Sequence, residues 1–143
     1  MFREHIVDSS QLDKRLLQIL QLCGSTLRSL DIRFTNLIGE NLSEYKGTLP
    51  CLENMNMSDC IQLTNKGLLQ ILQLCGSTLR SLDIQFTNIT GENLSEYKGT
   101  LPCLENMNMN DCNQLINSQT KDCCRYFSFV EVHLDPWIYQ IQI

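Results

Sequence analysis

The sequence lacks the features that mark membrane, secreted and nucleic-acid-binding proteins. No run approaches the ~20 apolar residues that span a bilayer, and residues 1–8 contain no apolar core of signal-peptide length. Only 11 basic residues stand against 16 acidic ones, so the net charge of −5 provides no basic surface for nucleic acid or an anionic membrane. We therefore expect a cytoplasmic or nuclear protein that binds neither nucleic acid nor a membrane.

The sequence is also poor in residues for catalysis. It contains two histidines, His5 and His133, and no phosphate-binding glycine loop, metalloprotease helix or nucleophile elbow. Cys123 and Cys124, with His133, are the one grouping that suggests thiol or metal chemistry, but adjacent cysteines do not have zinc-knuckle spacing and no third group orients a Cys–His pair. We therefore expect no enzyme, metal or cofactor, with a thiol-based metal or redox protein as a minor alternative.

What the sequence does contain is a long internal repeat. Residues 16–67 and 68–119 align over 52 positions and differ at eight: Arg33/Gln85, Leu37/Ile89, Ile38/Thr90, Ser58/Asn110, Ile61/Asn113, Thr64/Ile116, Lys66/Ser118 and Gly67/Gln119. Self-similarity at a fixed period is typical of solenoid proteins. With 143 residues, 43% of them apolar, the chain predicts one elongated domain with a packed core.

The cysteines follow the same repeat. Six of the eight form equivalent pairs: Cys23/Cys75, Cys51/Cys103 and Cys60/Cys112. Periodic placement indicates structural positions, and a reducing compartment keeps thiols from pairing. We expect these cysteines to be buried thiols that pack as small apolar residues.

Each 52-residue unit contains a shorter pattern twice. Apolar residues at i, i+3 and i+5 begin at Leu27, Leu52, Leu79 and Leu104, at spacings of 25, 27 and 25 residues, and their period-two alternation predicts short strands. Between strands, helical spacing appears at two sets of residues: Leu16, Ile19, Leu20 and Cys23, and Leu68, Ile71, Leu72 and Cys75. We expect Thr64 or Asn65 to cap the second helix and Gly76 to end it in a left-handed conformation.

The other half of each unit predicts one or two helical turns around Leu42 and Tyr45, or Leu94 and Tyr97, which Pro50 and Pro102 prevent from continuing. A strand, a turn and a helix every ~26 residues fall within the range of leucine-rich repeats. Residues 52–68 resemble the cysteine-containing subclass, best known as the substrate-recruiting arm of F-box proteins, and the resemblance covers about 12–115. It departs from the pattern where threonine replaces cysteine, at Thr35 and Thr87, and where Ile116 replaces the usual threonine.

The resemblance implies an α/β leucine-rich-repeat solenoid, with a curved parallel sheet on the concave side, helices on the convex side, and Cys60 and Cys112 in the core. A fifth strand is predicted where Phe127, Val130 and Val132 recover the strand pattern. We divide the chain into an N-terminal segment (1–11), the repeats (12–119), and a degenerate last repeat with a C-terminal tail (120–143). No polar terminal cap or F-box is visible, which suggests either a piece of a longer solenoid or a short gene product that retains only that piece. We expect this chain alone not to recruit a ligase.

Residues on the wet face of the strands are the candidate binding site. They offer stacked hydroxyls, amides and charges that suit a polar or weakly basic protein segment: Ser29, Asp31, Arg33, Asn54, Asn56, Ser58, Ser81, Asp83, Gln85, Asn106, Asn108 and Asn110. Asp31 and Asp83 are expected ~10 Å apart, too far to share a proton, and therefore to act in recognition. The alternative is that these residues only solvate the sheet. Phe34 and Phe86 are expected to plug the turns, with partner contact as the alternative, and Tyr45 and Tyr97 to be half-buried.

Together these features predict a non-catalytic protein–protein interaction module, resembling the substrate-recognition repeats of an F-box ubiquitin-ligase subunit. The alternative is a solenoid fragment or a self-assembling structural piece that has no partner of its own. In that case the uncapped edges of the sheet would pair with copies of the chain.

Overall fold

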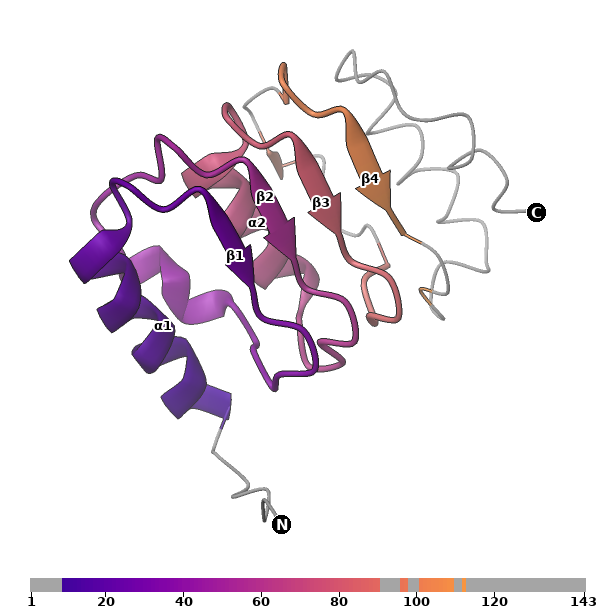
Figure 1. Ribbon diagram of the computed structural model, residues 1–143. Coiled ribbons are helices and arrows are strands. Elements are labelled where there is room, and N and C mark those ends of the chain that lie inside the picture. The colour runs from indigo at the N-terminus through magenta and orange to yellow at the C-terminus, as the bar shows by residue number, and fades with distance from the viewer. Residues whose placement is uncertain (1–8, 91–95, 98–100, 110–111, 113–143) are drawn as a thin grey trace, which may run out of the picture.

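The computed structural model describes residues 9–90, 96–97, 101–109 and 112. Its regular elements, in chain order, are α1 (Ser9–Cys23), β1 (Ser29–Asp31), the 3-10 helix η1 (Glu40–Glu44), β2 (Asn54–Asn56), α2 (Asn65–Cys75), β3 (Ser81–Asp83) and β4 (Asn106–Asn108). The fold is α/β, as predicted (Figure 1). Helix α1 includes the last three residues of the segment 1–11. The predicted fifth strand and the C-terminal tail lie outside the described residues.

The four strands form one parallel sheet in the order β1-β2-β3-β4, the order in which they occur in the sequence. The register places Leu30 beside Met55, Met55 beside Leu82, and Leu82 beside Met107. These central residues point inward as the period-two pattern predicted, because Met55, Leu82 and Met107 are at most 4% exposed while their strand neighbours are more exposed.

The helices form the second layer of the fold. The 3-10 helix η1 contacts both α1 and α2, and Figure 1 shows α2 behind the sheet. Apolar residues from both layers make one core, which contains Leu20, Leu52, Met57, Leu72 and Leu82. Neither α-helix within the described residues has the length and apolar character needed to cross a membrane.

The ends of α2 show one confirmed and one wrong prediction. Thr64 caps the helix by accepting a hydrogen bond from the backbone N–H of Gly67 at 2.9 Å. Gly76 is not left-handed, because its φ of −57° and ψ of −33° are those of a right-handed helix. Glycine is needed there for space: a Cβ atom would collide with the hydroxyl of Tyr97 and lie 2.6 Å from the carbonyl oxygen of Leu72.

Threonine and cysteine occupy equivalent places behind the strands. Cys60 and Cys112 are buried, as predicted, and their thiols donate to the carbonyl oxygens of Ile32 and Ile84. The hydroxyl of Thr35 lies 3.4 Å from the sulfur of Cys60 and donates to the same carbonyl of Ile32. Thr35 and Cys60, from consecutive half-repeats, therefore donate to one carbonyl group, the threonine within its own loop and the cysteine across to the loop before it.

Three of the other cysteines are less buried than predicted, and one tyrosine is more buried than predicted. Cys75 is buried, but Cys23 and Cys51 are only partly covered and Cys103 is exposed, because Cys51 and Cys103 follow a proline in a surface turn. Tyr45 is half-buried, as expected, and its hydroxyl donates to the carbonyl oxygen of Leu20. Tyr97 is more deeply buried, at 8% exposure.

Candidate functional site

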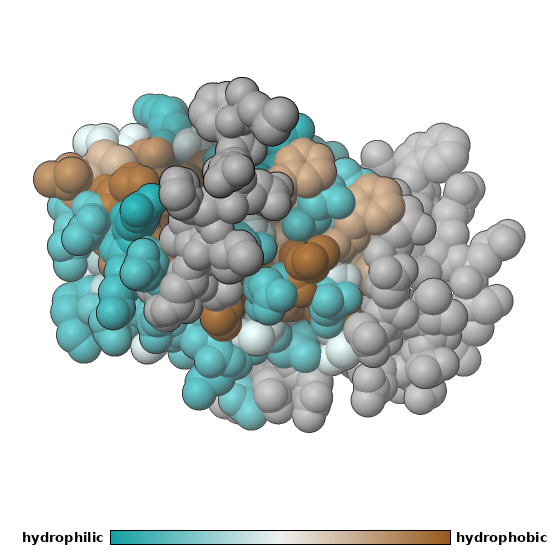
Figure 2. Space-filling view, turned by 90° about the horizontal axis from the view of Figure 1, so that it is seen from below, coloured by the Kyte–Doolittle hydropathy of each residue, from teal (hydrophilic) through white to brown (hydrophobic). Residues whose placement is uncertain are grey.

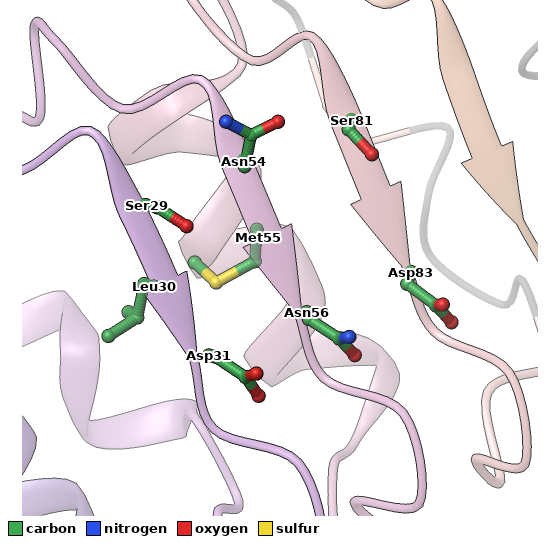
Figure 3. Close-up of a pocket in the computed structure, with 8 residues that line it drawn as sticks. All are labelled: Ser29, Leu30, Asp31, Asn54, Met55, Asn56, Ser81 and Asp83. Carbon is green, nitrogen blue, oxygen red and sulfur yellow. The ribbon is translucent and has the colours of Figure 1, made fainter.

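The candidate site is a shallow hollow on the face of the sheet that the helices leave open, which we call the open face. The register places Ser29, Asn54 and Ser81 in one row across the strands. Asp31, Asn56 and Asp83 form a second row two residues further along, as Figure 3 shows. With Leu30 and Met55 these residues line a hollow of about 280 Å³. The sequence pattern found both rows, and it assigned Leu30 and Met55 to the core, where Met55 is buried and Leu30 packs against it.

The second row has a structural role that the sequence analysis missed. Oδ1 of Asp31 accepts a hydrogen bond from the backbone N–H of Arg33, and Oδ1 of Asp83 accepts one from the N–H of Gln85. Asn56 makes the same bond to the N–H of Ser58, at 3.0 Å. Each of these side chains therefore holds the turn after its strand, which is a common use of aspartate and asparagine.

The first row has no such task. Within the part of the chain that the structure describes, the side chains of Ser29, Asn54 and Ser81 make no hydrogen bond to another residue. They continue into Asn106 on β4, which is exposed as well. This row presents hydroxyl and carboxamide groups that are solvated now and are available as donors and acceptors for a ligand.

The two repeats differ in charge at the hollow. Asp31 forms an ion pair with Nε of Arg33 at 2.9 Å, and the hydrogen bonds from the backbone and then the side chain of Arg33 lower the pKa of its carboxyl group. The second repeat has Gln85 in place of Arg33. Asp83 consequently makes no ion pair with a described residue, and its Oδ2 accepts only weak bonds of 3.4 Å from Gln85 and Asn108. The hollow is therefore more negative on the β3 side.

The remaining predicted site residues divide into three groups. Arg33 and Gln85 lie just beyond the strands and border the hollow through their contacts with Asp31 and Asp83. Ser58 was predicted to be on the surface, but it is only 3% exposed, and its carbonyl oxygen accepts a hydrogen bond from the backbone N–H of Phe34 in the loop after β1. Asn106 and Asn108 lie on β4, and Asn110 lies outside the described residues.

Three apolar residues in the loops after β1, β2 and β3 are exposed. Phe34 and Phe86 do not plug the turns as predicted, because their side chains are 75% and 43% exposed. Ile61, which the sequence analysis did not select, is 55% exposed. The signal available in the sequence was Asp59, which occupies the position of Phe34 and Phe86 in the intervening half-repeat and shows that the position faces water.

The geometry of the hollow suits binding by hydrogen bonds and charge. Asp31 and Asp83 are separated by two strand spacings, roughly 10 Å, so they do not share a proton. The described residues contain no group of three or more metal-ligating side chains placed to hold one ion, while Cys123, Cys124 and His133 lie outside them. In comparisons with known proteins, no family model, no curated protein and no solved structure matched the chain.

Proposed function

We propose that the protein is a non-catalytic protein-binding module of leucine-rich-repeat type, whose open face receives a polar segment of a partner protein. The observation that carries the proposal is the row of Ser29, Asn54 and Ser81, whose polar groups line a hollow without being used by the protein itself. Because these groups are neutral, a ligand can replace their water at a modest desolvation cost.

The repeat architecture supports the same proposal. Parallel strands in sequence order, 25 to 27 residues apart, the first three followed by the same turn, are the arrangement expected of stacked leucine-rich repeats. Such a stack displays equivalent side chains at one strand spacing, ~4.8 Å. A role like that of F-box substrate-recognition repeats, in the cytoplasm or nucleus, is part of this proposal and rests on the sequence resemblance alone.

The charge difference between the repeats gives the proposed site a direction. A ligand that runs across the strands meets a carboxylate neutralised by Arg33 on β1 and an unneutralised carboxylate, Asp83, on β3. A lysine or arginine of the partner would gain most beside Asp83. We therefore propose a segment with polar residues over the first row and a basic residue at the β3 end.

The test compares two triple-lysine variants in capture experiments from cytosolic extract. The site variant carries Ser29→Lys, Asn54→Lys and Ser81→Lys, which fill the first row without touching the turn-forming row. The control carries Gln18→Lys, Gln21→Lys and Gln73→Lys, which add the same charge at exposed positions of the helices.

Circular dichroism should first show that both variants keep the wild-type spectrum. Proteins captured by the wild type and the control but lost from the site variant support the open face as the binding site. If all three chains capture the same proteins, the proposal is wrong.

A second candidate function, self-assembly, is favoured by apolar residues of the first repeat that are more exposed than their counterparts in the second. We call these residues, Ile19, Leu27, Leu30 and Ile32, the outer end of the first repeat. Residues 16–32 and 68–84 have identical sequences, yet Ile19 is 48% exposed where Ile71 is 1% exposed. Leu27, Leu30 and Ile32 are likewise only partly buried, whereas their counterparts Leu79, Leu82 and Ile84 are at most 1% exposed. The segment 68–84 is covered by the half-repeat that contains β2, and no described residue covers the segment 16–32 in the same way.

We infer from this difference that the outer end of the first repeat can pack against a second copy of the chain, which carries the half-repeat sequence of 41–57 again at 93–109. Light scattering between about 5 and 200 µM measures it directly. Mass that grows with concentration in the wild type, but not in an Ile19→Lys variant, supports assembly. A constant monomer mass in the wild type excludes it.

A further inference from the structure

A second surface lies at the edge of the sheet where the strands end. Phe34, Ile61 and Phe86 come from the loops after β1, β2 and β3, and all three are exposed to solvent. We call them the apolar edge. Figure 2 views the molecule from this end, and it shows apolar residues at separate places among polar ones on the described part of the face.

The backbone at the two phenylalanines is unfavourable for this residue type. Phe34 has a φ of 58° and Phe86 a φ of 54°, in the left-handed region that bulky side chains rarely adopt. Asp59 holds the same place in the loop after β2 with a φ of 59°. Aspartate tolerates this conformation, so the turn itself has a better residue available.

Neither the turn nor the core therefore explains the phenylalanines. The turn would be more stable with asparagine or aspartate, and the rings lie largely outside the core. Each ring remains in water at a hydrophobic cost that contact with another apolar surface would remove. Exposed apolar side chains that gather at one place mark interaction surfaces more often than single ones do.

The charges around the apolar edge indicate what kind of partner it fits. The described loops after β1, β2 and β3 extend to Gly39, Leu63 and Thr90. At the ends of these strands and in these loops, Arg33 is the one positively charged side chain, and it is paired with Asp31. Asp59 and Asp83 add two carboxylates that form no ion pair with any described residue. One positive charge against three negative ones favours a basic partner.

We propose that the apolar edge docks the apolar face of a basic amphipathic helix of a partner protein. Adjacent strands lie ~4.8 Å apart, so Phe34 and Phe86 are separated by roughly 10 Å. On a helix, residues i and i+7 share one face and are ~10.5 Å apart along the axis, with i+3 or i+4 between them. Apolar residues at these three positions match the three loops, and lysines beside them face Asp59 and Asp83.

The three apolar residues do not line the hollow, although Asp83, which faces the same partner, does. The variants that test the apolar edge can therefore leave the open face intact. Phe34→Asn with Phe86→Asn suits the left-handed turns, so the double variant should fold at least as stably as the wild type. Leu22→Asn, at an apolar residue of α1 that is 88% exposed, is the matched control for non-specific apolar binding.

The probe is a fluorescent helical peptide with leucines at i, i+4 and i+7 and lysines elsewhere on its polar face. Two matched peptides carry serine for leucine or glutamate for lysine. Fluorescence anisotropy with the full chain, at 50 and 300 mM salt, should show binding of the leucine–lysine peptide alone, weaker at the higher salt. The Phe34→Asn, Phe86→Asn variant should raise its Kd at least tenfold, and Leu22→Asn should leave it within twofold.

Three results would overturn the proposal. The first is the absence of binding of the leucine–lysine peptide to the wild type. The second is equal binding of the glutamate or serine peptide, which would remove the assigned charge or apolar contact. The third is an unchanged Kd in a double variant that keeps the wild-type circular dichroism spectrum and melting temperature.

Discussion

Leu82 and Leu30 test the packing most directly, because they are equivalent residues in the two repeats with different surroundings. Leu82 is 1% exposed at the centre of β3, between β2 and β4. Leu30 is at the centre of β1, an edge strand of the described sheet, and is only partly buried. The same change, leucine to alanine, therefore removes the same atoms from two environments.

We expect Leu82→Ala to cost about 3–4 kcal/mol of unfolding free energy and Leu30→Ala about 1.5–2 kcal/mol. Removing three buried carbon atoms costs ~2.4 kcal/mol at ~0.8 kcal/mol for each buried CH₂ group. The closed cavity left at Leu82 adds ~1 kcal/mol or more. At Leu30 part of the side chain is already in water and no closed cavity forms, so most of the transfer cost remains but the cavity cost does not.

Urea unfolding followed by circular dichroism measures both values, provided that the slope against urea concentration is the same in each variant. Asp83→Asn is the surface control. Asparagine keeps the oxygen that accepts from the backbone N–H of Gln85, so the change should be below ~0.5 kcal/mol. Equal losses for Leu82→Ala and Leu30→Ala would refute the packing described here, as would a large loss for Asp83→Asn.

Three further predictions concern single buried sites. Asp13→Ala should cost roughly 3 kcal/mol in the same assay, because the buried carboxylate accepts hydrogen bonds from the backbone N–H groups of residues 38, 39 and 41; a loss below about 1 kcal/mol would contradict this role. Gly76→Ala should lower the melting temperature although the φ of Gly76 is ordinary, because the tyrosine hydroxyl of Tyr97 occupies the space of the new methyl group. The decrease should be smaller in a Tyr97→Phe background, and additive effects of the two changes would exclude that contact. Burial raises the pKa of the Cys75 thiol from 9.0 to about 12, so the folded chain keeps a proton that the unfolded chain loses, and stability should fall as the pH rises above about 9 toward 12. Cys75→Ala should make that fall shallower between pH 9 and 10.5, and identical slopes would argue against it.

The strands and their register were predictable because they rest on a period of two. Leu-x-Ile and Met-x-Met patterns recur at 25 to 27 residues, and only one face of each strand can be apolar if the other meets water. The rows of the open face follow directly from this alternation. The cap of α2 at Thr64 was also readable, because it depends on one side chain and the N–H three residues later.

The errors arose where a contact joins distant parts of the chain. Gly76 resembles a left-handed helix stop, but its reason for being glycine is Tyr97, 21 residues later. Ser58 continues the polar alternation of β2 in the sequence, yet it is buried, and its carbonyl oxygen accepts from the N–H of Phe34 in the neighbouring loop. Phe34 and Phe86 are apolar residues next to a strand, which predicts burial, and only the left-handed backbone places them in water.

The sequence by itself determined the period of the chain, the strands and the identity of the polar rows, because these depend on the local alternation of apolar and polar side chains. The tertiary structure decided which of two identical segments is buried. Ile19 and Ile71 stand in the same 17-residue sequence, and one is largely exposed while the other is covered. Burial depends on what packs against a residue, and in a stack of repeats that neighbour is another repeat.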